Sequence, residues 1–105
     1  MVVISEFDAR LNMKAFIDRA RRPYSEWYTA TSTAPRERLF RDHGVDEASG
    51  WWFAEELESA EAARRVQGFL VKLGCESATD EPEPGVDAQP TSVYAYLKVE
   101  GRTTP

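Results

Sequence analysis

The cysteine and histidine content limits the chemistry open to this sequence. A single cysteine, Cys75, rules out an intrachain disulfide and any CxxC motif, and no Cys–His signature marks it as a nucleophile. A single histidine, His43, excludes a zinc site built on imidazoles. A metal site in this chain would need oxygen ligands, which points to magnesium, manganese or calcium.

The stretch WYTATSTAPRERLFRDH, residues 27–43, resembles the second half of the GIY-YIG nuclease signature. That signature runs from a strand with Tyr-Ile-Gly, through a Thr or Ser, into a helix that carries Arg and then His or Tyr. Tyr28 matches the signature tyrosine and Thr31 matches the hydroxyl residue. Arg38 lies ten residues after Tyr28, and His43 follows five residues later, where the family more often has four.

Two further segments are similar to parts of the same family. Residues 62–70 resemble its later helix, in which apolar residues surround one metal-binding Glu; that position here holds Gln67. Residues 92–97, SVYAYL, resemble the Gly-Ile-Tyr strand. In the family this strand comes first, whereas here it comes last, as though the chain were permuted around the sheet. The permutation would supply the missing first tyrosine as Tyr94.

The resemblance implies phosphodiester cleavage of nucleic acid with Mg²⁺ or Mn²⁺. A carboxylate-held metal binds the scissile phosphate, an arginine stabilises the phosphoryl oxygens, and a tyrosine or imidazole orients the attacking water. The catalytic residues it implies are Tyr28, Arg38, His43 and Tyr94. The implied substrate-binding residues are Thr31, Arg36 and Arg41, and the metal position is Gln67.

Three departures from the family pattern predict weakened or lost cleavage. The amide of Gln67 is a neutral ligand, which binds a hard dication more weakly than a carboxylate does. The glycine of Tyr-Ile-Gly is Ala30. The spacing of five residues puts Arg38 and His43 about 140° apart on an ideal α-helix, so they point together only if the helix is locally distorted.

Each candidate residue also has a structural interpretation. Arg38 and Asp42 stand at i and i+4, the spacing of a surface ion pair on a helix. His43 is placed to flank the core or to cap a helix end. Tyr28 is equally suited to aromatic packing on a strand. Gln67 interrupts an apolar stripe, where a polar group needs a hydrogen-bond partner.

The alternative function is a non-catalytic protein-binding or regulatory module that uses a surface around Trp51 and Trp52. The formal charge of −5 disfavours broad coating of nucleic acid, although the clustered arginines leave a weak, local contact open. We expect the acidic run to lie at a solvated helix start, where the helix dipole favours carboxylates. Its members are Glu55, Glu56, Glu58 and Glu61.

The elements that must position these residues alternate along the chain. Apolar spacing and end signals predict helices over 6–22 and 36–43 and a third from the cap Ser59 to Gly74. Aromatic and alternating runs predict strands over 26–31, 51–57 and 92–100. A solvated loop is expected over 76–90 and a frayed tail over 101–105. The sequence therefore predicts one mixed α/β domain, residues 1–105, with a small three-stranded sheet and about three helices.

Composition and the first residues predict the compartment. Of the 105 residues, 42% are hydrophobic and 30% charged, as in folded soluble domains. The early apolar run, residues 1–4, is far too short for a secretory or membrane-spanning segment. We therefore expect a cytoplasmic protein without a membrane anchor.

Overall fold

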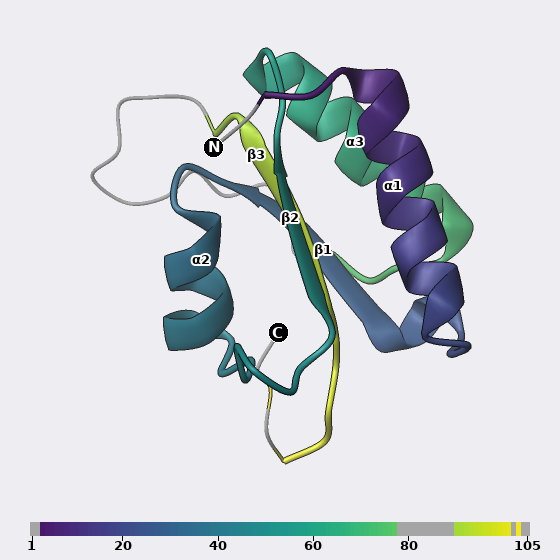
Figure 1. Cartoon of the computed structure of the whole chain (residues 1–105), viewed down its shortest axis with the longest axis vertical. Coiled ribbons are helices and arrows are strands. Elements are labelled where there is room, and N and C mark those ends of the chain that lie inside the picture. Colours follow the sequence, from purple (N-terminus) through teal and green to yellow (C-terminus); the bar gives the residue numbers. More distant parts are fainter. Residues whose placement is uncertain (1–2, 78–89, 102, 104–105) are drawn as a thin grey trace.

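A three-stranded antiparallel sheet lies at the centre of the protein, in the order β1-β3-β2. The computed structural model describes residues 3–77, 90–101 and 103. The strands are β1 (Trp27–Ser32), β2 (Trp52–Glu56) and β3 (Ser92–Leu97), and helices cover both faces of the sheet (Figure 1). The predicted fold class, mixed α/β with a small three-stranded sheet and flanking helices, is confirmed.

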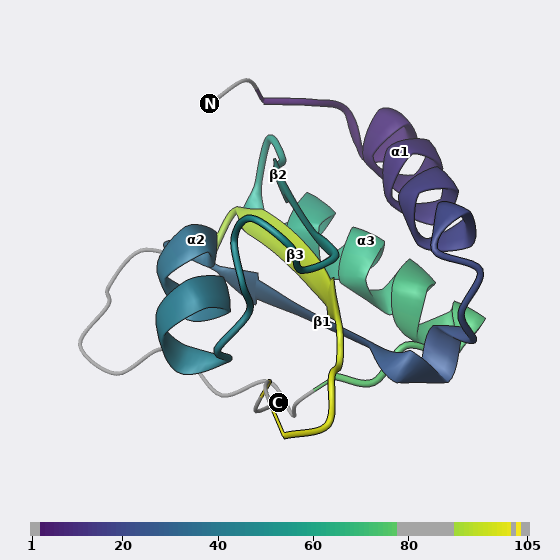
Figure 2. The same cartoon turned by 60° about the horizontal axis from the view of Figure 1, so that its bottom comes forward.

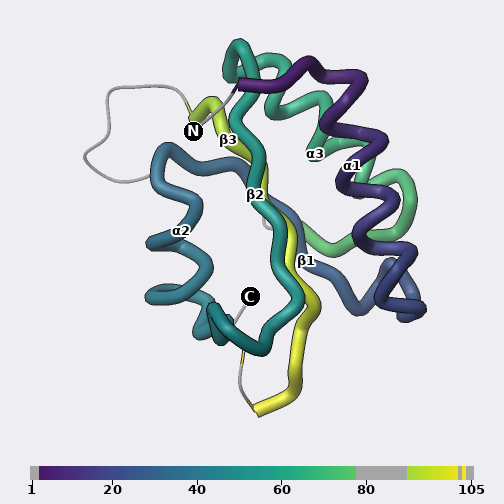
Figure 3. Tube along the Cα trace, viewed as in Figure 1, coloured from purple at the N-terminus to yellow at the C-terminus, as the bar shows by residue number. Residues whose placement is uncertain are grey.

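The last strand of the sequence is the middle strand of the sheet. Among the strands, β1 and β2 each pair with β3 and not with each other, and Figure 3 traces the three strands running side by side. Successive side chains of a strand point to opposite faces. Val93 and Ala95 therefore face one core, and Tyr94 and Tyr96 face the other. Since both faces are covered, nearly all of β3 is buried.

The larger core lies between the sheet and two long helices, α1 (Glu6–Arg19) and α3 (Ala60–Leu73). Both helices begin at a serine N-cap: the Asp8 N–H donates to Ser5 Oγ, and the Ala62 N–H donates to Ser59 Oγ, each at 3.1 Å. Such caps satisfy amide groups that have no partner within the helix. The two predicted helix starts are therefore confirmed.

The end of α1 differs from the prediction, which continued the helix to residue 22. The helix ends at Arg19, and Arg21 adopts a left-handed backbone with a φ of 56°. A residue before proline is disfavoured in helical geometry, so Pro23 limits the helix well before its own position. The closing turn is made by the Arg21 N–H, which donates to the Asp18 carbonyl.

The second face of the sheet carries a short helical segment rather than the continuous α-helix predicted for 36–43. It consists of α2 (Pro35–Glu37) and a π-helical turn, η2 (Arg38–Asp42). Figure 2 shows this segment on the opposite side of the sheet from α1 and α3. It closes a smaller core with the sheet, formed by Tyr28, Leu39, Val45, Tyr94 and Tyr96.

The acidic run does not lie at a helix start as a whole. Glu55 and Glu56 belong to β2, because the aromatic residues before them are drawn into the sheet. Glu61 alone lies in the first turn of α3. Most of the predicted loop, residues 78–89, lies outside the described residues, as do 102, 104 and 105 of the predicted tail.

Candidate functional site

A buried tyrosine–histidine cluster lies between β1, β3 and the π-helical turn. The His43 Nε2 atom is 2.7 Å from the Tyr94 hydroxyl, and its Nδ1 atom is 3.2 Å from the Tyr96 hydroxyl. The ring centroid of Tyr28 lies 5.1 Å from that of the imidazole. We call these four residues, Tyr28, His43, Tyr94 and Tyr96, the tyrosine–histidine cluster.

The π-helical turn is what brings His43 into the cluster. The His43 N–H donates to the Arg38 carbonyl at 2.9 Å, a bond between residues five apart. This turn supplies the local distortion that the Arg38–His43 spacing requires. The two side chains nevertheless go different ways: His43 is 4% exposed, while the Arg38 side chain is 40% exposed and pairs with Asp42 at 2.9 Å.

Both ring nitrogens of His43 lie within hydrogen-bond distance of a tyrosine hydroxyl. A neutral imidazole has one N–H donor and one acceptor nitrogen. In that form of the ring, one tyrosine hydroxyl accepts from His43 while the other donates to it. Burial raises the pKa of Tyr96, with the charges of Tyr28 and Tyr94 adding to the effect. Tyr96 therefore acts as a neutral hydrogen-bonding group at neutral pH.

The predicted substrate-binding arginines lie at the surface above the cluster. Arg36 and Arg41 are exposed. The Arg36 guanidinium lies 5.2 Å from the centre of the Trp52 ring and forms an ion pair of 3.4 Å with Glu47. An exposed pair of this length contributes little to stability. The arrangement shows an arginine resting on a tryptophan, on the same side of the sheet as the cluster.

Gln67 and Thr31 lie on the other side of the sheet from the cluster. Gln67 is on α3, which packs with α1, and its Nε2 donates to Ser77 Oγ at 2.5 Å. Thr31 is three residues along β1 from Tyr28, so the alternation of the strand turns it to the opposite face. The structure thus brings Tyr28, His43 and Tyr94 together and separates Gln67 and Thr31 from them.

The residues of the cluster do not fit Mg²⁺ or Mn²⁺. These ions take several oxygen ligands, chiefly carboxylates. In the part of the chain that the structure describes, no three His, Cys, Asp or Glu side chains come together in a way that would hold a metal. The side chain at the implied metal position, Gln67, donates to Ser77 and belongs to α3, on the other side of the sheet from the cluster.

Tyr96 is the member of the cluster that the sequence analysis did not select as a site residue. Its hydroxyl lies within hydrogen-bond distance of His43 Nδ1, while the Tyr94 hydroxyl contacts Nε2. The signal was present, because Tyr94 and Tyr96 stand two apart on an alternating strand and so share a face. That both hydroxyls reach the imidazole depends on where the fold places His43, which the alternation of the strand does not determine.

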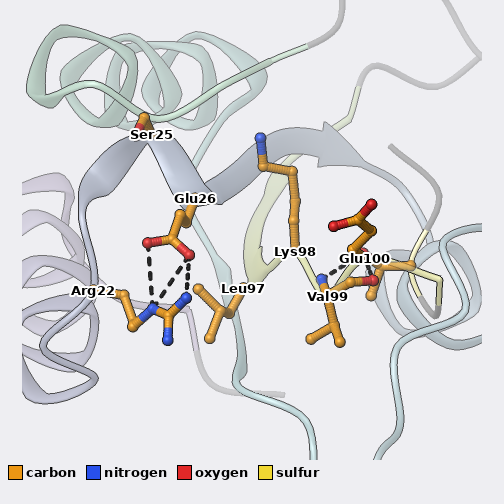
Figure 4. A pocket seen from close by; sticks show the side chains of 8 residues that line it. Arg22, Ser25, Glu26, Leu97, Lys98, Val99 and Glu100 are labelled. Atoms are coloured by element: carbon orange, nitrogen blue, oxygen red, sulfur yellow. Dashed lines mark hydrogen bonds and ion pairs between the residues drawn. The ribbon is translucent and has the colours of Figure 1, made fainter.

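A surface pocket at the end of β3 is separate from the cluster. Figure 4 shows Arg22 paired with Glu26 across its wall. Lys98, also in the wall, forms an ion pair of 2.6 Å with Glu76. The pocket therefore presents paired charges of both signs. Its lining residues are Arg22, Ser25, Glu26, Leu97, Lys98, Val99, Glu100 and Thr103.

Cys75 is buried in the larger core and is a poor nucleophile. Burial raises the pKa of its thiol to about 11. Because the thiolate is the reactive form, a thiol with this pKa is almost wholly unreactive at neutral pH. Cys75 therefore serves as a small apolar residue of the larger core.

A second feature of interest is an aromatic surface at the start of β2. Trp51 is 38% exposed and its ring centroid lies 5.3 Å from that of Phe16 on α1. Trp52 lies on the other face of the strand. Its ring centroid is 5.0 Å from that of Phe40, and the Arg36 guanidinium lies over its ring. The two tryptophans thus anchor both layers of helices while leaving one indole partly open to solvent.

Glu55 gives this part of β2 a dependence on pH. Burial raises the pKa of its carboxyl above the ordinary value of 4.5. The folded state therefore favours the neutral form, and stability falls as the pH rises through this range. We expect Glu55→Gln to stabilise the protein at pH 7 by under about 1 kcal/mol and to have no effect at pH 3, measured by urea unfolding. An equal effect at both pH values would contradict this, and exposed Glu58→Gln is the control.

No protein-family model matches the chain, and no curated protein or solved structure gives a significant match. Within the described ranges, no helix combines the length and the apolar character needed to cross a lipid bilayer.

Proposed function

We propose that this chain is a non-catalytic protein-binding module that uses the aromatic surface around Trp51 and Trp52. The observation that carries the proposal is the closure of the tyrosine–histidine cluster. Both ring nitrogens of His43 are bound by tyrosine hydroxyls, and the imidazole is 4% exposed. A general base must reach the proton it removes, and here the ring is enclosed by the fold.

The aromatic surface supplies the positive support for binding. Tryptophan and arginine are enriched at protein interfaces, where a large ring is buried by the partner. Trp51 is partly open on one side of β2, and Arg36 lies against Trp52 on the other, so the two tryptophans flank this end of the strand. The formal charge of −5 favours a protein partner over nucleic acid. The single buried thiol of Cys75 is consistent with a cytoplasmic location, which is part of the proposal.

Partner capture tests this function. The chain is immobilised and proteins retained from its source cell are quantified alongside those retained by Trp51→Ala and by Val71→Ala, an exposed apolar position on α3. We expect a retained partner that Trp51→Ala loses and Val71→Ala keeps, since an aromatic anchor typically contributes more than tenfold to affinity. Retention of the same proteins by all three would contradict the proposal.

A second candidate is nucleic-acid cleavage, and one observation favours it. Tyr28, Tyr94 and His43 lie together on one face of the sheet, as the resemblance to the nuclease signature requires. A permuted, disabled nuclease would regain a metal carboxylate through Gln67→Glu.

Gln67→Glu separates the two candidates. Gln67 is 8% exposed, so we expect the added carboxylate to destabilise the protein by about 1–3 kcal/mol at pH 7 and by less at pH 4. We expect no cleavage of plasmid DNA or an RNA oligonucleotide with Mn²⁺. Val71→Glu adds the same charge at an exposed position of α3 and serves as the control. Cleavage gained by Gln67→Glu alone would favour the nuclease.

A further inference from the structure

The outer edge of β2 has main-chain groups that point away from the sheet. Leu97 N–H donates to the Trp51 carbonyl and Leu57 N–H donates to the Thr91 carbonyl, each at 2.9 Å. The odd-numbered residues of this strand therefore bind β3. By the alternation of an antiparallel pair, the N–H and C=O groups of Trp52 and Ala54 point outward.

These outward groups have no main-chain partner among the residues that the structure describes. Within the described residues, this edge is covered at its end, where Val3 bridges Glu56 and the Ile4 N–H donates to the Glu56 carbonyl at 2.9 Å. All five residues of the strand are half-buried, in contrast to the buried β3. Figure 1 looks onto this edge: β2 is the nearest strand, with α2 on one side and α1 on the other.

The side chains at the end of this edge carry unneutralised negative charge. Glu55 and Glu56 project to opposite faces of β2. Neither forms an ion pair with a cation in residues 3–77, 90–101 or 103. The nearest polar contact is the Thr91 hydroxyl, which donates to Glu56 Oε1 at 3.4 Å. A strand laid along Trp52 and Ala54 would end beside Ile4 and bring its last side chains within reach of these carboxylates.

We propose that the outer edge of β2 binds an extended basic peptide as a fourth strand of the sheet. The main-chain groups of Trp52 and Ala54 hold the peptide backbone, which ends beside Ile4, and long lysine or arginine side chains at that end reach the carboxylates of Glu55 and Glu56. Strand addition of this kind draws affinity from main-chain bonds and specificity from alternate side chains. The inference rests on the proposed protein-binding function and names the chemistry of the partner.

A second copy of the chain fits this edge less well than a basic peptide. Antiparallel pairing of two β2 strands about Ala54 sets Trp52 opposite Glu56 of the other copy, which provides no cation for either glutamate. Two copies would also bring together formal charges of −5 each. The occupant that the charges favour is therefore a positively charged segment of another protein.

The test begins with a phage library of random nine-residue peptides selected on the intact chain. We expect selected peptides with alternating apolar residues and an excess of Lys and Arg. Synthetic versions are then N-methylated at alternate residues in two complementary patterns. One pattern blocks the amides that face β2 and is expected to weaken binding at least roughly tenfold, while the other leaves binding intact. Equal effects of the two patterns, or acidic selected peptides, would overturn the proposal.

Two protein variants complete the test. Proline is tolerated on an edge strand where its N–H would face solvent, so Ala54→Pro is expected to fold and to lose peptide binding at least roughly tenfold. The pair Glu55→Gln and Glu56→Gln is expected to weaken binding of basic peptides roughly fivefold at low salt and to spare a neutral peptide. If Ala54→Pro does not fold, the N-methylated peptides decide the question without it.

The outcomes also separate this inference from the proposed function. A partner that depends on Trp51 but binds Ala54→Pro normally would keep the protein-binding function and overturn strand addition. If the unmodified chain captured no partner and selected no peptide, both the protein-binding function and strand addition would be overturned.

Discussion

His43→Ala is expected to destabilise the protein by about 2–4 kcal/mol. The substitution leaves a cavity in a core where the imidazole is 4% exposed, and it takes a hydrogen-bond partner from both Tyr94 and Tyr96. A domain of this size has roughly 5–15 kcal/mol of total stability, so the loss is a large fraction of it. Urea unfolding followed by tryptophan fluorescence measures the change.

Two controls give this result its meaning. His43→Phe retains a ring of similar shape without the polar atoms and is expected to fall between the wild type and His43→Ala. Arg38→Ala, one π-turn away, removes an exposed ion pair and is expected to cost under about 0.5 kcal/mol. Catalytic residues are often replaced at little cost in stability. An unchanged stability of His43→Ala would therefore argue for a functional histidine.

Trp27→Ala is expected to have the largest effect in the chain, about 3–5 kcal/mol, and in a marginally stable protein to prevent folding. Trp27 is fully buried in the larger core and meets Phe16 edge-to-face at 5.9 Å between ring centroids. Thermal unfolding and the yield of folded protein report the effect. Trp51→Ala, at a partly exposed ring, is expected to cost under about 1 kcal/mol.

A milder substitution tests why the indole is present. The Trp27 indole N–H is buried and finds no acceptor among the described residues. An unpaired buried donor costs free energy, so Trp27→Phe removes volume but also removes that cost. We expect it to destabilise the protein by under about 2 kcal/mol. A loss as large as that of Trp27→Ala would show that the full width of the indole is required.

Local signals in the sequence were sufficient for most elements. Ser5 and Ser59 lie at the starts of α1 and α3 because a serine hydroxyl can satisfy a free helical N–H, a requirement that depends on few neighbours. Gly74, with a φ of 123°, ends α3 where an L side chain would be strained. The alternation over 92–97 similarly marked β3 as a strand.

The arrangement of the strands could not be predicted from such local signals. Tyr96 and Val93 alternate as on any two-faced strand, and nothing in that pattern says which strand is central. The π-helical turn is also a tertiary outcome. It shifts His43 beneath the sheet by one residue relative to an α-helix, which lets the ring meet Tyr94 and Tyr96.

The candidate site could be predicted only in part, because local sequence signals do not determine which elements meet in the fold. Tyr28, Tyr94 and His43 do come together, from β1, the end of η2 and the distant β3. Gln67 does not join them, because its position on an amphipathic helix decides only that it lies near a core and not which face of the sheet that core covers. With cores on both faces, the sequence pattern left that choice open.

The central position of the last strand also constrains how the protein is made. Thr29 Oγ1 donates to the Tyr94 carbonyl across 65 positions of sequence, and every strand pairing in the sheet requires β3. Contacts between such distant residues form late, since a long loop must close before they are gained. During synthesis, β1 and β2 therefore leave the ribosome without a partner strand. Their aromatic edges stay available to chaperones, or to aggregation, until residues 92–97 have emerged.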